Sequence, residues 1–138
     1  MKFIDIETKR VGNTTRGGRA RMGFDEIRSA INMGSKTDKY PTLRTVLGLG
    51  VIDQLRLKKG DGMRVKYTND GLWFKRDPEA QFKLHNNGKS HNLRIQFPLW
   101  PDMPHSTDTI NIPSQTVKFE YYEGGILIDW PQEITNGS

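Results

Sequence analysis

The chain has 138 residues, of which 34% are hydrophobic and none is cysteine, and its formal net charge is +5. A single domain of this length can bury a hydrophobic core without disulfide or metal cross-links. The lack of cysteine excludes disulfides and cysteine-ligated zinc. No apolar run approaches the roughly 20 residues that cross a bilayer, and the first residues do not read as a secretory leader, so we expect a soluble, cytoplasmic protein with no membrane partner.

The charges are unevenly distributed along the chain. Residues 1–92 contain 19 Lys and Arg against 10 Asp and Glu, whereas residues 93–138 contain 2 against 6. The first part therefore carries +9 and the second −4. A basic surface attracts polyanions, above all nucleic acid, although surface lysines can also serve solubility alone.

The chain begins with an alternating segment, KFIDIETKR, which predicts a short strand. A loop rich in glycine, threonine and arginine follows and contains Arg16, Arg19 and Arg21. Guanidinium groups bind phosphate bidentately, and mobile arginine arms follow nucleic-acid backbones, so this loop is a candidate contact for nucleic acid. A solvated loop without a ligand is the alternative.

Two short helices are expected next. Residues 24–33 place apolar side chains three and four apart, acids in the first turn and a glycine at the end. A second helix is expected from Thr42, where Leu43 and Leu47 would share one face until two glycines weaken it.

Residues 55–77, LRLKKGDGMRVKYTNDGLWFKRD, carry the clearest local pattern in the chain. Apolar and polar residues alternate on both sides of Asp70-Gly71, which predicts a hairpin with a two-residue turn and Tyr67 opposite Phe74. One face, directed to the core, would carry Met63, Val65, Tyr67, Leu72 and Phe74. The other would carry Arg64, Lys66, Trp73 and Lys75.

The basic face of this hairpin has two interpretations. Cations interleaved with an exposed indole suit the phosphates and stacked bases of a single strand. An indole half-buried against lysine side chains is the more ordinary arrangement, and such a face can also pair with an acidic face across a homodimer.

The hairpin pattern recurs later in the chain. Residues 63–77 align without a gap on residues 117–131, each apolar position stays apolar, and Gly124-Gly125 is expected at the second turn. The outer face of this second hairpin is mainly acidic. An internal duplication would explain the alignment, but any two hairpins share a period of two.

The segment LRLKKGDGMRVKYTNDGLWFKR resembles the second half of the SpoVT/AbrB-type swapped-hairpin (looped-hinge) family. The residues that carry the resemblance are Leu57, Gly60, Asp61, Val65, Gly71 and Phe74. It implies a preceding strand and helix within residues 19–33, a degenerate second copy within residues 93–131, and a pseudo-dimeric barrel. It also implies a transcription regulator that binds DNA through basic residues of the first strand, which here match Arg19, Arg21 and Arg28.

The sequence contains no recognisable catalytic or cofactor-binding pattern. His85, His91 and His105 are not spaced as zinc ligands, and no glycine-rich loop ends in the lysine and hydroxyl residue that bind phosphate. We therefore expect no metal, no cofactor and no enzymatic activity.

These features predict a single α+β, mostly β domain over residues 1–138, with two hairpin-centred halves at about residues 19–77 and 93–131. The residues expected to pack the halves together are Met63, Val65, Tyr67, Phe74, Phe119, Tyr121, Ile128 and Trp130.

The leading interpretation of function is a non-enzymatic nucleic-acid-binding protein, with DNA favoured over RNA. The residues expected to contact the nucleic acid are Arg16, Arg19, Arg21, Arg28, Arg64, Lys66, Trp73 and Lys75. The alternative is a small protein-binding module, such as a phage- or plasmid-type inhibitor of a host protein, with Tyr121, Tyr122 and Trp130 as interface anchors.

Overall fold

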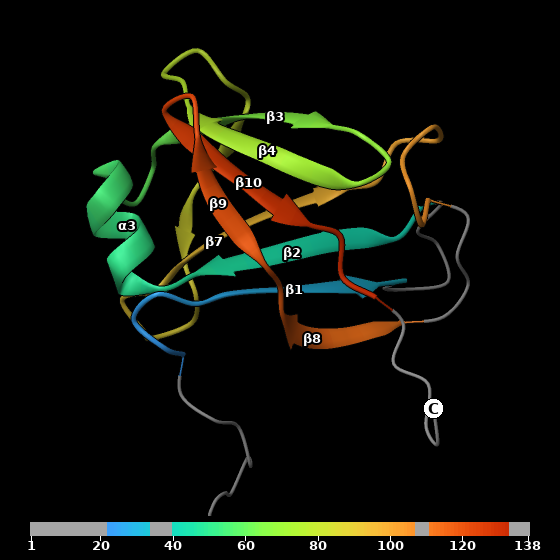
Figure 1. Ribbon diagram of the computed structural model, residues 1–138, viewed down its shortest axis with the longest axis horizontal. Helices are drawn as coiled ribbons and strands as arrows, with labels where there is room; N and C mark the ends of the chain where they lie inside the picture. The colour runs from blue at the N-terminus through green and yellow to red at the C-terminus, as the bar shows by residue number, and fades with distance from the viewer. Residues whose placement is uncertain (1–21, 34–39, 107–110, 133–138) are drawn as a thin grey trace, which may run out of the picture.

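The computed structural model describes residues 22–33, 40–106 and 111–132. These residues form ten strands and one short helix, arranged as two five-stranded antiparallel sheets with the hydrophobic core between them (Figure 1). The expected fold class, α+β and mostly β, is confirmed. The predicted strand at the beginning of the chain lies outside the described residues.

The first sheet has the strand order β6-β7-β2-β1-β8. Its strands are β1 Ile27–Asn32, β2 Thr42–Leu47, β6 His85–Asn86, β7 Leu93–Pro98 and β8 Ile112–Thr116. The second sheet has the order β5-β3-β4-β10-β9. Its strands are β3 Gly62–Tyr67, β4 Gly71–Arg76, β5 Phe82–Lys83, β9 Phe119–Tyr122 and β10 Gly125–Asp129.

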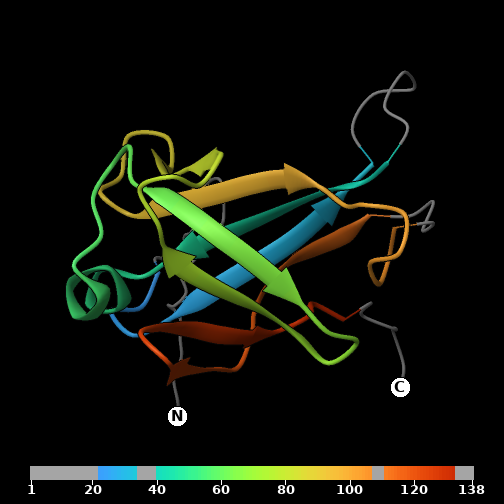
Figure 2. The ribbon, with the colours of Figure 1, turned by 90° about the horizontal axis from the view of Figure 1, so that it is seen from above.

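The outermost strands of one sheet continue directly into those of the other. Only Leu84 separates β5 from β6, and two residues separate β8 from β9. In that second connection the Val117 amide donates to the Ile27 carbonyl of the first sheet (2.9 Å), and the Lys118 carbonyl accepts from the Asp129 amide of the second (2.9 Å). Figure 2 shows the strands of the two sheets crossing, the arrangement in which corner strands bend from one sheet into the other.

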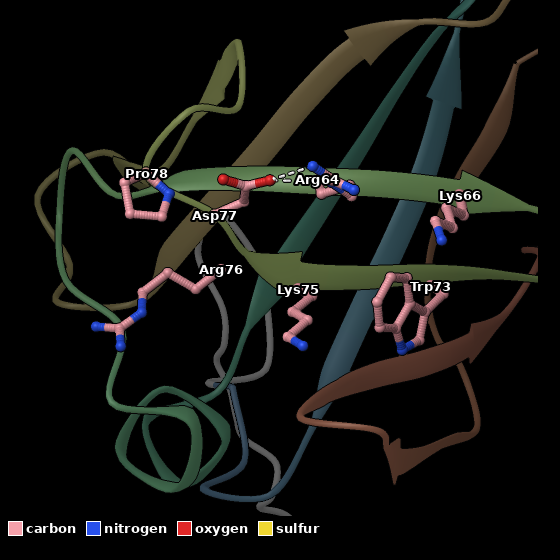
Figure 3. A pocket seen from close by; sticks show the side chains of 7 residues that line it. All are labelled: Arg64, Lys66, Trp73, Lys75, Arg76, Asp77 and Pro78. Atoms are coloured by element: carbon pink, nitrogen blue, oxygen red, sulfur yellow. Dashed lines mark hydrogen bonds and ion pairs between the residues drawn. The ribbon is translucent and has the colours of Figure 1, made fainter.

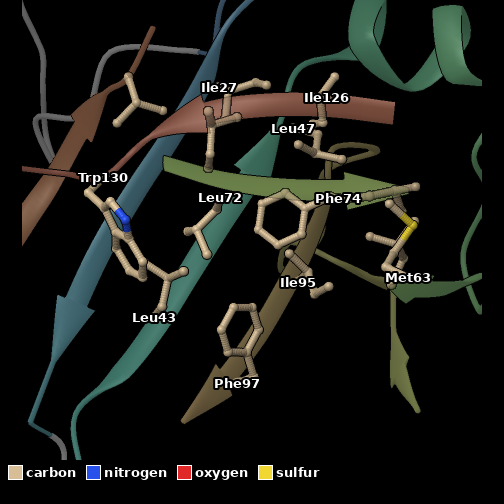
Figure 4. Close-up of a cluster of buried hydrophobic side chains, with 14 of the residues drawn as sticks. Ile27, Leu43, Leu47, Met63, Leu72, Phe74, Ile95, Phe97, Ile126 and Trp130 are labelled. Atoms are coloured by element: carbon tan, nitrogen blue, oxygen red, sulfur yellow. The ribbon is translucent and has the colours of Figure 1, made fainter. Parts of the chain in front are cut away.

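Both sheets contribute large apolar side chains to one core (Figure 4). Phe74 of β4 meets Phe97 of β7 edge to face, with ring centroids 6.3 Å apart. One polar pair is enclosed with them, since the hydroxyls of Ser29 and Thr45 lie 2.9 Å apart on neighbouring strands.

The predicted core is partly correct. The buried or partly buried members are Met63, Val65, Phe74, Phe119, Ile128 and Trp130. The prediction was wrong for Tyr67 and Tyr121, which are 41% and 44% exposed. Each lies near the hairpin end of its strand, where side chains on both faces are exposed.

Both predicted helices were wrong, because their residues form β1 and β2. On β2 the residues that face the core are Leu43, Thr45 and Leu47, with Val46 buried on the other face. The spacing of four between Leu43 and Leu47 suits a strand as well as a helix. The pairing partners decide between the two structures: β2 lies between β1 and β7, and β7 begins about 50 residues later in the chain.

The one helix in the described residues, α3 Leu49–Leu55, begins among the glycines that were expected to weaken a helix. The Gly48 amide donates to the Glu26 carbonyl, and the Gly50 amide to the Phe24 carbonyl, both at 2.7 Å. A Cβ atom on Gly48 would lie 2.6 Å from the Phe24 carbonyl oxygen, so the glycine allows the residues before β1 to pack against the start of α3.

The first hairpin, β3–β4, has the predicted faces but a different turn. Tyr67 is opposite Leu72 instead of Phe74, and Thr68 pairs with Gly71 through an amide-to-carbonyl bond of 2.8 Å. The turn therefore lies one residue earlier, at Asn69-Asp70. The register shifts by two residues, which leaves every side chain on its predicted face.

The second hairpin, β9–β10, turns at Glu123-Gly124, again one residue before the predicted pair, and both residues have positive φ (47° and 80°). It pairs with the first hairpin through β10 and β4, so that Phe74 faces Ile126 and Trp73 faces Leu127. Because Trp73 and Leu127 occupy aligned positions, the hairpins are related by a local two-fold arrangement. The duplication of residues 19–77 and 93–131 stays a prediction.

Candidate nucleic-acid interface

The outer face of β3–β4 brings together four of the predicted contact residues (Figure 3). Arg64 lies opposite Lys75, and Lys66 lies opposite Trp73. Alternation along the two strands places these side chains away from the core. They line a shallow depression of about 400 Å³ together with Arg76, Asp77 and Pro78. We call this surface the basic face.

Trp73 is held in place from two sides. Its indole nitrogen donates a hydrogen bond to the Tyr122 carbonyl oxygen at 2.9 Å, which ties the first hairpin to the second. The ammonium of Lys66 lies 5.3 Å from the centre of the indole ring, within cation–π range. The ring therefore packs against a lysine side chain and positions its positive charge. This arrangement competes with the stacking of a base on the same ring.

Asp77 is the one carboxylate among the described residues that lines the basic face. It forms an ion pair with Arg64, whose Nη2 lies 2.7 Å from Oδ2, and its Oδ1 accepts the Glu79 amide at 2.9 Å. The Glu79 hydrogen bond, and secondly the one from Arg64, lower the pKa of Asp77. Four cationic side chains and this carboxylate line the depression, which leaves a net charge of +3.

Arg76 is a lining residue that the sequence interpretation did not include. Its position in the alternation assigned it to the inner face, but it lies at the end of β4, is exposed, and reaches the Arg56 carbonyl (3.4 Å). The three consecutive charged residues from Lys75 to Asp77 could have indicated that Arg76 is exposed. Such a run is expected at the end of a strand, where the opposite sheet does not cover the side chains.

Arg28 lies on the other sheet, away from the basic face. It is on β1, and its Nε donates to Glu26 Oε2 at 2.8 Å. The structure therefore does not bring Arg28 together with Arg64, Lys66, Trp73 and Lys75. Arg16, Arg19 and Arg21 lie outside the described residues.

The basic face adjoins an acidic one on the same sheet. Leu127 is opposite Trp73, and the next outward-facing positions include Glu120 and Asp129, both exposed. One outer surface thus changes from positive over β3–β4 to negative over β9–β10. A second copy of the chain rotated by half a turn would meet it with complementary charge.

Among the described residues, no three histidine or acidic side chains gather where they could hold a metal ion. No helix there is long and apolar enough to cross a membrane. No protein-family model, no curated protein and no solved structure matches the chain.

Proposed function

We propose that the protein is a non-enzymatic nucleic-acid-binding protein that contacts its ligand through the basic face. The observation that supports this proposal is the grouping of Arg64, Lys66 and Lys75 around Trp73 on two adjacent strands. Cations held close together on a rigid sheet neutralise neighbouring phosphates and release their counterions. The resemblance to swapped-hairpin regulators favours DNA over RNA and a role in transcription.

Within this proposal the residues have distinct tasks. Lys66 and Lys75 supply charge to the phosphates, and neither has an ion-pair partner among the described residues. Trp73 positions the Lys66 ammonium through its ring. Arg64 is partly neutralised by Asp77, so its contribution is the smallest of the three cations.

Fluorescence anisotropy with labelled single-stranded DNA, duplex DNA and RNA at several salt concentrations tests the proposal. We expect affinity to fall steeply with salt. The double variant Lys66→Gln/Lys75→Gln should lower the affinity and reduce the salt slope by about 1.4 for a single strand or about 1.8 for a duplex. The matched control is Lys89→Gln/Lys118→Gln, which removes two exposed lysines outside the basic face.

Equal losses in the two double variants would mean that net charge alone attracts nucleic acid, and the proposed interface would be wrong. Failure of the wild type to bind any of the three ligands at low salt would reject nucleic-acid binding itself. Light scattering on the same samples reports whether the chain dimerises.

A protein-binding module is the second candidate, because aromatic side chains are exposed near the second hairpin. Tyr121 and Tyr122 on β9 are 44% and 51% exposed. Tyrosine is enriched at the energetic centres of interfaces. Trp130 does not support this candidate, because it is buried and its indole nitrogen donates to the Thr68 carbonyl at 2.8 Å. A stoichiometric protein partner that survives nuclease treatment and is lost in Tyr122→Ala would favour this function.

A further inference from the structure

A cavity of about 660 Å³ lies on the outer face of the first sheet, the face turned away from the core and from the second sheet. It is a different surface from the basic face and contains none of its residues. Its floor and walls include Ala30, Asn32, Arg28, Arg44, Val46 and Asn111. We call it the arginine cavity.

The strand register explains why a cavity forms here. Ala30 is opposite Arg44, and Arg28 is opposite Val46, so each arginine stands beside a short side chain on the neighbouring strand. Ala30 and Val46 are each only 8% exposed although they face outward, because longer side chains around them form walls. A floor of small residues between two guanidinium groups is therefore built into the β1–β2 pair.

A bulge in β8 shapes the third side of the cavity. Ser29 of β1 is opposite Gln115, but Ile31 is opposite Ile112, so β8 has one residue more than β1 over this stretch. The extra residue falls at Pro113-Ser114, both of which line the cavity. Bulges re-aim side chains and are frequent next to binding sites.

Arg28 is fixed by Glu26. The carboxylate accepts from Arg28 Nε at 2.8 Å, from the Gly23 amide at 2.6 Å and from the Thr116 hydroxyl. Its negative charge is thus used within this network, and Glu26 does not line the cavity. Arg28 is therefore held in the wall of the cavity by a carboxylate that lies outside the cavity.

Arg44 is different, because it is half-buried and its guanidinium forms no hydrogen bond or ion pair with any described residue. No carboxylate of the described residues lines the arginine cavity. Arginine is almost never fully buried without a partner, and its planar donors match the oxygens of phosphate. The unpaired charge indicates an anionic ligand.

We propose that the arginine cavity binds a small phosphate-bearing molecule of about mononucleotide size. Arg44 contacts the phosphate. Asn32 and Asn87 offer amide donors and acceptors to a polar ring edge, and the floor of Ala30 and Val46 packs against its flat face. The volume falls within the range of small-molecule sites, about 300–1,000 Å³.

Isothermal titration calorimetry with the full chain tests the proposal, using inorganic phosphate, pyrophosphate, the four 5′-ribonucleoside monophosphates and the corresponding nucleosides as probes. We expect at least one monophosphate to bind, and its nucleoside to bind at least 10-fold more weakly. Arg44→Gln should weaken binding of that monophosphate at least 10-fold, and Ala30→Leu, which fills the floor from the opposite strand, should do the same without changing any charge.

Lys118→Gln is the matched control, because it removes one exposed positive charge that lines neither the arginine cavity nor the basic face, and it should leave phosphate binding unchanged. Circular dichroism on each variant shows that it is folded. The proposal is overturned if no phosphate-bearing probe binds the wild type, if a nucleoside binds as tightly as its monophosphate, or if folded Arg44→Gln binds like the wild type. Arg44→Gln should retain the nucleic-acid affinity of the basic face, so the two sites can fail independently.

Discussion

The indole nitrogen of Trp73 in the first hairpin donates a hydrogen bond to the main-chain carbonyl of Tyr122 in the second. The two residues are 49 positions apart in sequence, and their hydrogen bond crosses the strand β10 that lies between β4 and β9. Trp73, which the sequence suggested as a surface for base stacking, therefore also links the two hairpins.

Trp73→Phe removes this donor and keeps a ring beneath Lys66. We expect the free energy of unfolding to fall by about 1 kcal/mol, the usual net value of one hydrogen bond. Urea denaturation measures the change. Trp100→Phe is the matched control, because the Trp100 indole nitrogen has no hydrogen-bond partner among the described residues. An equal loss in both variants would mean that ring area, and not the hydrogen bond, is responsible.

Gly71→Ala tests why this glycine is needed. Its φ is not positive, so the turn does not require it, but a Cβ atom would lie 2.6 Å from the Ile128 carbonyl oxygen on β10. We expect a loss of about 2 kcal/mol or more, because the two strands would have to separate. Asp70→Ala, at the exposed turn, should cost much less. A similar small loss for both would show that β10 does not approach β4 so closely.

The Glu26 network predicts a specific pH dependence. The Arg28 hydrogen bond, followed by those from Gly23 and Thr116, lowers the pKa of Glu26 from 4.5 to about 2. The stabilisation is thus complete above pH 4.5 and is lost as the pH falls towards 2, because the unfolded chain takes up the proton first. The pKa shift corresponds to at most about 3 kcal/mol.

Glu26→Gln should therefore be less stable than the wild type at pH 7, and the difference should shrink as the pH falls to 2. Thermal unfolding at several pH values measures it. Glu120→Gln, which removes an exposed carboxylate on β9, is the control and should change stability little. A constant difference between Glu26→Gln and the wild type at all pH values would contradict the assigned network.

The buried hydroxyls of Ser29 and Thr45 predict a coupling energy. Thr45→Val leaves the Ser29 hydroxyl buried without this partner, and Ser29→Ala does the converse, so each should cost about 1–2 kcal/mol. The double variant should cost less than the sum of the two, with a coupling of about 1 kcal/mol. Additive losses in chemical denaturation would mean that each hydroxyl finds another partner.

The sequence predicts the faces of the β3–β4 hairpin better than its turn. A period of two assigns Arg64, Lys66 and Lys75 to one face, and a register shift of two residues does not change that assignment. The turn was predicted one residue too late because Gly71 was taken to be a turn residue, since glycine readily adopts the positive φ angles of such turns. The structure instead uses the absence of a side chain at Gly71 to bring β10 close.

The first sheet could not be predicted in the same way, and the arginine cavity was missed with it. Residues 27–32 and 42–47 have spacings that suit a helix as well as a strand. The neighbours that make them strands, β7 and β8, are distant in the chain, and local pattern carries no information about such partners. Arg44 falls within the segment that was expected to be a helix, whereas the sheet places it opposite Ala30.

The pairing of β1 with β8 has a consequence for synthesis on the ribosome. The β3–β4 hairpin can form as soon as its own residues have emerged, but β1 gains its second neighbour only when residues 112–116 have left the exit tunnel. Until then β1, and β4 without β10, each present an unpaired row of amides and carbonyls. The growing chain is therefore most prone to intermolecular pairing just before its last three strands appear, and a stop codon placed between residues 98 and 112 should yield an aggregating fragment.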